Sequence, residues 1–163
     1  MKDPREVILD FIARFKGSEE VFLHGCCYWF ARILEERFYS HPGAEIKYEP
    51  VEGHFITKID YRYYDVRGDV TECYRGKPMY DLYELHRDHC KYYDHLMRDC
   101  RDFAEDEDEK NTDVFALLKA QDPINPERSG KGTYWYYCCG NCGQPLDPGD
   151  PFCRKCGRAV KWE

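Results

Sequence analysis

Hydrophobic residues in the first forty positions recur at the three- and four-residue spacing of amphipathic helices. A first helix is expected to begin at Pro4, because the aspartate cap Asp3 followed by proline at the first helical position is a favourable start. Gly17 is expected to end it. A loop over residues 18–25 then leads to a second helix, which begins near residues 26–27. The apolar face of the first helix consists of Val7, Ile8, Phe11, Ile12 and Phe15.

Residues 46–66 alternate between apolar and polar positions, a pattern typical of β-strands. One strand is expected near Tyr48. Two further runs, 54–59 and 62–66, are expected to form an antiparallel hairpin that turns at residues 60–61. Helical periodicity returns over residues 79–103, so the pattern as a whole predicts an α+β fold.

The stretch after residue 120 changes character, because polar residues, proline and glycine replace the periodic pattern. Such a stretch is typical of a boundary between domains. The expected organisation is an α+β domain over residues 1–120, a linker over 121–133 and a small cysteine-containing unit over 134–163.

The strongest chemical signal is a pair of CxxC motifs near the C-terminus. Residues 139–157 read C-G-N-C-G-Q-P-L-D-P-G-D-P-F-C-R-K-C-G, with a glycine after each motif. Each motif makes a tight turn that directs two thiolates at one ion, and four thiolates form the closed tetrahedral shell of a structural Zn²⁺ site. The expected ligands are Cys139, Cys142, Cys153 and Cys156.

Cys138 leaves one alternative open, because Cys138 and Cys142 would form a poorer C-x3-C turn. About 25 residues cannot build a stable core alone, so the metal is expected to supply the folding energy of this segment. The segment resembles the short zinc-ribbon modules appended to many bacterial and phage proteins.

A second set of residues carries candidate covalent chemistry. Cys26 and Cys27 fall at the first turn of the second predicted helix, where backbone N–H groups and the helix dipole stabilise a thiolate. His54 opens a predicted strand and could act as the base for the thiol. If the hairpin turns at residues 60–61, Asp65 lies diagonally opposite His54 on the same sheet face, and Asp69 is the alternative third member.

The order of a helix-start cysteine, a strand histidine and an aspartate on the next strand resembles papain-like and transglutaminase-like cysteine enzymes. Gly25, Cys27, Phe30 and Ala31 are similar to the transglutaminase-core pattern G-x-C-x-x-F/Y-A. The stretch G-H-F-I-T-K-I-D-Y-R-Y-Y-D-V-R-G is similar to the His-strand and Asp-strand element of that family. The resemblance covers roughly residues 22–70 and lacks the tryptophan that usually follows the histidine.

This resemblance implies a papain-like or transglutaminase-like α+β fold and a triad of Cys27, His54 and Asp65. The implied activity is hydrolysis of amide or isopeptide bonds in a peptide or protein substrate. Two alternatives stay open: transglutaminase-like acyl transfer to an amine, and a non-enzymatic interaction or inhibitor protein on the same scaffold. Loss of effect in Cys27→Ala separates the enzyme from the interaction protein.

Charge and composition limit the classes of partner that the protein is expected to bind. The net charge is −7, and residues 1–120 carry 18 basic against 26 acidic side chains. Nucleic acid is therefore an unlikely partner, because phosphate binding needs clustered lysine and arginine. No apolar run reaches the ~20 residues that a membrane span requires, so no membrane contact is expected. Ten cysteines with two CxxC motifs and no signal-peptide pattern indicate a cytoplasmic protein.

One more group of metal-ligating residues lies on the third predicted helix. His86, His89 and Cys90 follow the i, i+3, i+4 spacing that could bind a second metal ion. No matching ligand pair is evident elsewhere in the sequence, so a structural role is favoured for these three side chains.

Overall fold

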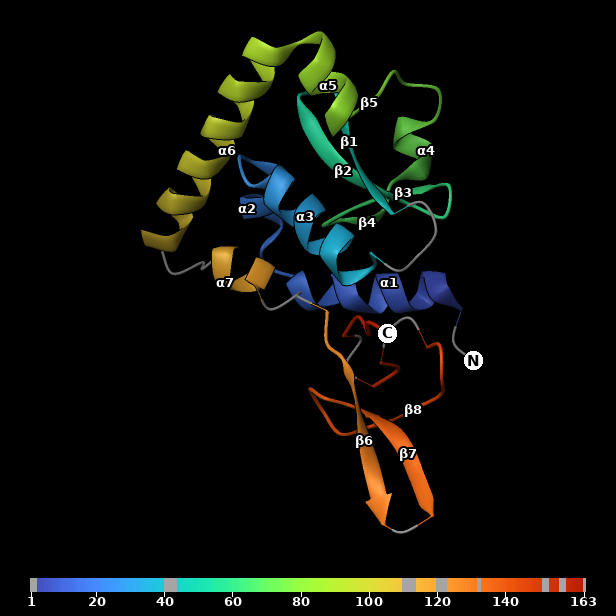
Figure 1. Cartoon of the computed structure of the whole chain (residues 1–163). Helices are drawn as coiled ribbons and strands as arrows, with labels where there is room; N and C mark the ends of the chain where they lie inside the picture. The colour runs from blue at the N-terminus through green and yellow to red at the C-terminus, as the bar shows by residue number, and fades with distance from the viewer. Residues whose placement is uncertain are drawn as a thin grey trace.

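The computed structural model combines helices with antiparallel sheet and ends in a small zinc-ribbon unit (Figure 1). This α+β class agrees with the prediction from the sequence. The residues that the structure describes are 3–39, 44–109, 114–119, 123–131, 133–150, 153–155 and 158–162.

Most residues between Pro4 and Arg37 are helical. The side chain of Asp3 accepts a hydrogen bond from the backbone N–H of Arg5, so the predicted cap of the first helix is present. A short helix that the sequence pattern did not predict fills part of the expected loop 18–25. The helical elements are α1 (Pro4–Ile12), η1 (Ala13–Phe15), α2 (Glu19–Leu23) and α3 (Cys27–Arg37).

A five-stranded antiparallel sheet forms the centre of the larger domain, in the order β4-β3-β2-β1-β5. The β2–β3 hairpin turns at Asp60 and Tyr61, with φ angles of 48° and 66°. Both angles suit the two central positions of a tight hairpin turn. Ile59 pairs with Arg62, which confirms the predicted register. The strands are β1 (Glu45–Glu49), β2 (His54–Ile59), β3 (Arg62–Asp65), β4 (Gly68–Asp69) and β5 (Tyr80–Asp81).

Helix α3 crosses the sheet and is held on β2 (Figure 1). Two buried apolar clusters meet along it, one with α1 and α2 and the other with β1, β2 and the later helices. The hydroxyl of Thr57 on β2 donates to the backbone carbonyl of Ala31 on α3 over 3.0 Å. A buried hydroxyl that has a partner fixes the helix on the strand without a desolvation penalty. The N-terminus of α3 is thereby fixed relative to β2.

The predicted helix over residues 79–103 is divided in two. Asp81 and Glu84 form a capping box that starts α5, and α5 ends where His89 leaves helical backbone with φ −139° and ψ 44°. The next helix then runs to Glu109, beyond its predicted end. The remaining helices are α4 (Thr71–Tyr74), α5 (Leu82–Asp88), α6 (Cys90–Glu109) and α7 (Val114–Lys119).

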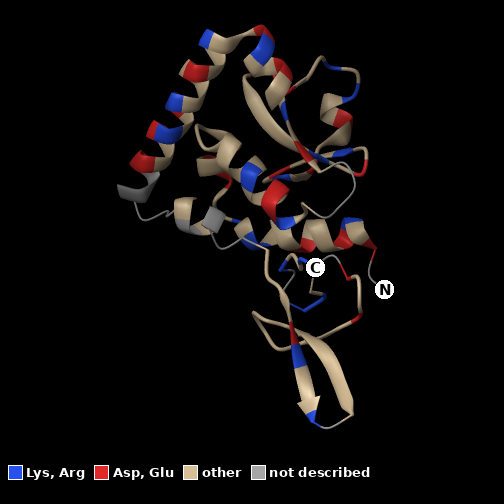
Figure 2. Cartoon of the chain, viewed as in Figure 1, with Lys and Arg blue, Asp and Glu red and all other residues tan. Residues whose placement is uncertain are grey.

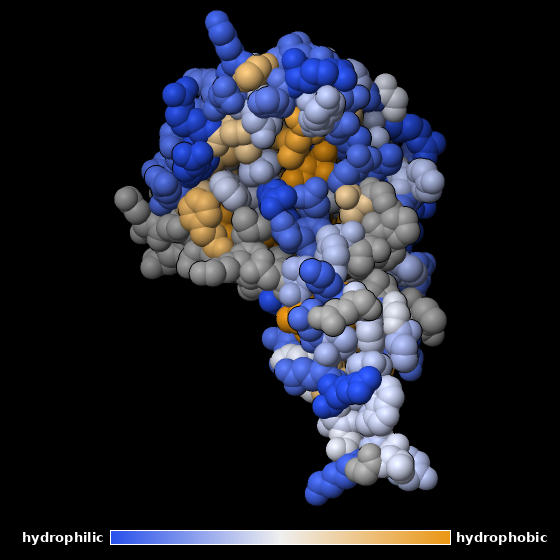
Figure 3. Space-filling view, viewed as in Figure 1, coloured by the Kyte–Doolittle hydropathy of each residue, from blue (hydrophilic) through white to orange (hydrophobic). Residues whose placement is uncertain are grey.

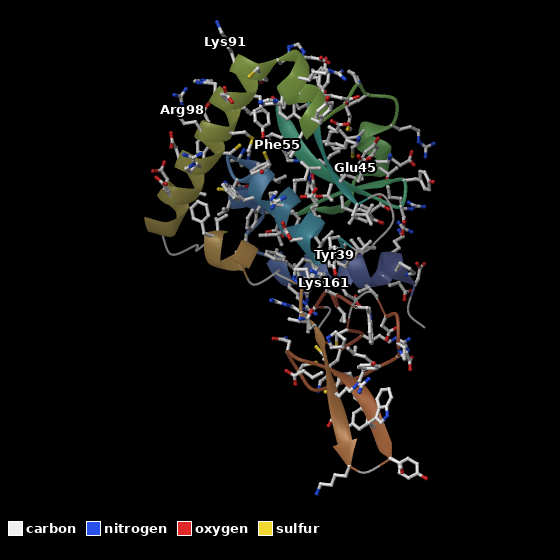
Figure 4. The ribbon with its side chains drawn as sticks, in the orientation of Figure 1. Tyr39, Glu45, Phe55, Lys91, Arg98 and Lys161 are labelled. Carbon is white, nitrogen blue, oxygen red and sulfur yellow. The ribbon has the colours of Figure 1, made fainter. Side chains whose placement is uncertain are left out.

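The ribbon unit is a three-stranded sheet of β6 (Pro126–Lys131), β7 (Tyr134–Cys139) and β8 (Pro145–Leu146). Its sheet begins within residues 121–133, which the sequence indicated as a linker, because β6 pairs with β7 along its whole length. The hairpin projects away from the larger domain (Figure 1). The two units meet where the Tyr39 hydroxyl donates to the carbonyl of Val160 over 3.4 Å, near the labelled Lys161 (Figure 4).

The surface is predominantly polar. Acidic and basic side chains are interspersed along α6 (Figure 2). Apolar surface shows mainly over the strands between α3 and α5 (Figure 3). Among the helices of the described residues, none combines the length and hydropathy needed to cross a membrane.

Candidate functional site

The N-terminus of α3 presents Cys27 as its first helical residue. Cys26 occupies the N-cap position, and no side chain caps the helix there. The first backbone hydrogen bond of the helix joins the N–H of Phe30 to the carbonyl of Cys26. The N–H groups of the first turn precede that bond, so they can stabilise a negative charge beside Cys27.

The structure distinguishes the two adjacent cysteines. Cys26 is 0% exposed and belongs to the apolar cluster beneath α3. Cys27 is 9% exposed and lies close enough to His54 to interact with its imidazole electrostatically. Of these two adjacent cysteines, Cys27 is therefore the one that lies beside a histidine and near the surface.

His54 lies between Cys27 and an aspartate. Its Nε2 atom is 3.1 Å from Oδ2 of Asp65, and both side chains are buried. With Nε2 paired to the carboxylate, Nδ1 is the ring nitrogen available to exchange a proton with the Cys27 sulfur. The ring also lies nearly parallel to the ring of Tyr74, at an angle of 21° and a centroid separation of 6.3 Å.

The environment holds His54 in its charged form. Burial by itself would lower the pKa of the imidazole, but the hydrogen bond with Asp65 and the electrostatic interactions with Asp65 and Cys27 outweigh it and raise the pKa to about 9. Cys27 therefore lies beside an imidazole that is held in its charged form.

Asp65 is held by a second group that the sequence pattern did not single out. Arg67 donates to Asp65 from its backbone N–H over 2.8 Å and from its guanidinium over 2.6 Å. Burial alone would raise the pKa of Asp65, but these bonds and the one to His54 lower it. A D-x-R spacing at a strand end was the available signal, since a turn there returns the arginine to the aspartate.

Asp69, the alternative third member, has other partners. Its carboxylate accepts hydrogen bonds from Arg5, Arg62 and Thr71. The structure therefore brings Asp65 and not Asp69 against His54.

Helix α6 covers the thiol end of α3. The indole N–H of Trp29 donates to the carbonyl of Cys100 over 2.6 Å, and the hydroxyls of Tyr48 and Tyr92 lie 2.7 Å apart. Cys27 and Cys100 belong to one apolar cluster, and burial with nearby charge raises the pKa of the Cys100 thiol to about 12. That thiol stays neutral, so its chemistry differs from the chemistry open to Cys27.

The ribbon gathers three of the four predicted ligands. The sulfur atoms of Cys139, Cys142 and Cys153 lie within 4.8 Å of one another, and those of Cys142 and Cys153 are 3.5 Å apart. The first turn closes with the N–H of Gly143 donating to the carbonyl of Cys139 over 2.8 Å. Cys156 lies outside the described residues. A converging set of thiols fits Zn²⁺, for which such donors are the common structural ligands.

Cys138 is separate from this cluster. Its thiol points to the backbone carbonyl of Glu127, at 3.5 Å, on the neighbouring strand. Among the described cysteines of the ribbon, Cys139 therefore supplies the first thiol of the cluster, and the C-x3-C alternative is disfavoured.

The fold of the chain and the cysteine cluster near its C-terminus together define an α+β protein with a C-terminal zinc-ribbon domain. A zinc-ribbon family model matches residues 139–160. The model described as Phage YunG-like protein matches residues 7–110, more than half of the chain, and the chain belongs to that family. Searches of curated proteins and of solved structures found no match.

Proposed function

We propose that the larger domain is a cysteine-dependent hydrolase that cleaves amide or isopeptide bonds of a peptide or protein. The observation that carries this proposal is the imidazole of His54, which pairs with Asp65 over 3.1 Å and interacts electrostatically with Cys27 at a helix N-terminus. In this arrangement Cys27 would act as the nucleophile, His54 as the base and Asp65 as the carboxylate that orients the histidine. It supports the papain-like or transglutaminase-like interpretation of the fold.

The first half of the proposed reaction is acylation. The Cys27 thiolate attacks the substrate carbonyl carbon, and first-turn N–H groups of α3 stabilise the resulting oxyanion. The carbon–nitrogen bond breaks, and His54 donates its proton to the departing amine. A thioester on Cys27 and a free amine are the products of this half-reaction.

The second half is deacylation. Neutral His54 takes a proton from water, and the hydroxide oxygen attacks the thioester carbonyl. The carbon–sulfur bond breaks, which releases a carboxylic acid and restores the thiolate and imidazolium. Asp65 stays ionised throughout and stabilises the charged imidazole, while Arg67 positions Asp65.

The ribbon has a separate role in this proposal. A structural Zn²⁺ held by Cys139, Cys142, Cys153 and Cys156 stabilises a unit whose buried apolar cluster is small. A closed thiolate shell leaves no open position for substrate, so the metal takes no part in the hydrolysis.

The reactivity of Cys27 is the direct test. Zinc-loaded protein is labelled with iodoacetamide at pH 6, where an ordinary thiol with a pKa of ~8.5 reacts slowly, and each cysteine is followed by peptide mass. Cys27 is expected to react faster than the exposed Cys73, although it is far more buried. His54→Ala is expected to slow Cys27 labelling by about tenfold or more and to leave Cys73 unchanged.

Activity is then measured with fluorogenic peptides and isopeptide-linked substrates. Cys27→Ala is expected to reduce turnover by roughly 10³-fold or more, whereas Cys26→Ala keeps activity in proportion to its folded fraction. Added primary amine reveals acyl transfer if it diverts the product from acid to amide. Slow, His54-independent labelling of Cys27 would overturn the enzyme proposal and favour the non-enzymatic interaction protein.

A further inference from the structure

A second cluster of metal-ligating side chains lies at the junction of α5 and α6, on a different part of the domain from the thiol site. His86, Cys90 and Asp94 follow one another at four-residue intervals, so they project from one face across the junction. All three side chains are exposed. Lys91, labelled at the start of α6 in Figure 4, marks this outer surface.

The distances between the donor atoms fit a single ion. The Cys90 sulfur is 3.9 Å from Nε2 of His86 and 3.9 Å from Oδ2 of Asp94, and all three donors lie within 4.8 Å of one another. Tetrahedral Zn²⁺ with ordinary bond lengths separates a nitrogen from a sulfur ligand by about 3.6 Å. Small rotations of the three side chains would therefore bring their donor atoms to bonding distance from one ion.

The neighbouring side chains leave the three donors accessible. Arg87 is bound to Asp88, and Arg98 donates to His95, so these two cations are engaged beside the cluster. His89, which the sequence spacing included in this group, packs edge-to-face on Tyr80 instead. Asp94 takes the place that sequence spacing assigned to His89.

We propose that His86, Cys90 and Asp94 bind a transition-metal ion of the Zn²⁺ class, separate from the ribbon metal. One imidazole, one thiolate and one carboxylate supply three protein ligands, and water or a ligand from a partner takes the fourth position. This donor set selects a borderline metal ion and disfavours Mg²⁺ or Ca²⁺, which prefer oxygen ligands alone. The ion joins the last turn of α5 to the first turns of α6 across the break at His89.

Metal stoichiometry of the full-length protein tests the proposal. Protein loaded with Zn²⁺ is passed into metal-free buffer and its zinc content is measured. Wild type is expected to retain two equivalents and Cys90→Ser one. Cys73→Ser is the matched control, because Cys73 is also an exposed thiol on a helix, and it is expected to retain two.

A spectroscopic measurement on a ribbon variant identifies the site. Cys139→Ser combined with Cys142→Ser removes the first pair of ribbon thiols, and with Co²⁺ this variant is expected to show a thiolate-to-cobalt charge-transfer band that decreases by about one site's intensity when Cys90→Ser is added. Zn²⁺ is also expected to protect Cys90, but not Cys73, from alkylation. Equal zinc content in wild type and Cys90→Ser, or equal alkylation of Cys90 with and without Zn²⁺, would overturn the proposal.

Discussion

At the residue scale, the charge of His54 depends on its hydrogen bond with Asp65 and on the nearby side chain of Cys27. Its pKa is raised to about 9 from an ordinary value of 6.5, so the folded state binds this proton more tightly than the unfolded chain does. The resulting stabilisation is complete below pH 6.5 and is lost as the pH rises through 9. The contribution of Asp65 to stability depends on pH in the opposite direction. Because the pKa of its carboxyl is lowered in the folded state, Asp65 stabilises the fold at pH values above its ordinary pKa, and this stabilisation is lost in acid.

Substitution of Asp65 by asparagine removes the carboxylate that stabilises the imidazolium. The pKa of His54 is then expected to fall by about one unit or more, and the alkaline loss of stability moves to lower pH. Histidine NMR titration of wild type, Asp65→Asn and the control Asp69→Asn measures this directly. Asp69 is bound to Arg5 and Arg62, so its substitution is expected to leave the His54 titration in place. An identical His54 pKa in all three proteins contradicts the assigned pairing.

At the scale of elements, the turn before α3 and the side of α6 must fit closely. Gly25 adopts φ +111°, and a Cβ atom there would lie 2.8 Å from the Phe103 ring. Gly17 has a similar backbone angle of +97° with nothing within 4 Å of its would-be Cβ. An alanine at Gly17 would therefore report backbone strain alone, whereas an alanine at Gly25 would report backbone strain together with steric overlap.

Gly17→Ala is expected to destabilise the fold by roughly 1–2 kcal/mol through backbone strain alone. Gly25→Ala is expected to cost about 1–3 kcal/mol more, because the new methyl group overlaps Phe103. Urea unfolding measures both values. Combining Gly25→Ala with Phe103→Ala tests the cause, since the additional cost should largely disappear relative to Phe103→Ala alone. An equal loss of unfolding free energy in the two glycine variants would contradict this prediction, because it would mean that α6 shifts to accommodate the methyl group.

The sequence was informative where local geometry decides structure. The Asp3 cap and the turn at Asp60 and Tyr61 follow from short-range rules, and the hairpin register follows from that turn. The break at His89 could not be predicted, because a helical pattern continues on both sides of it. Arg67 and Asp94 were missed for the same reason: their partners depend on how the backbone turns at a junction.

At the scale of the whole molecule, the ribbon and the larger domain have separate cores. The ribbon core consists of Cys139, Leu146, Cys153 and Val160, with smaller contributions from partly buried neighbours. The larger domain buries several apolar clusters of its own. Loss of the ribbon metal is therefore expected to act on one unit only.

Chelation of zinc is expected to unfold the ribbon while the larger domain keeps its cooperative transition, with Tm shifted by a few degrees at most. Tryptophan fluorescence resolves the two units, because Trp135 and Trp162 belong to the ribbon and Trp29 to the larger domain. Cys142→Ser should reproduce the chelated state without chelator. A single transition that moves as a whole would mean that the two units fold together.

The hydrogen-bonded pair His54 and Asp65 belongs to a single hairpin, and the two residues are eleven positions apart in the sequence. Successive side chains on a strand face opposite sides, so a one-residue insertion in either strand would move one partner to the wrong face. We therefore expect the spacing of this pair to be fixed wherever the pair is kept. Among Phage YunG-like proteins, lineages that keep both residues should keep this spacing, and lineages with an altered spacing should have lost the histidine or the aspartate.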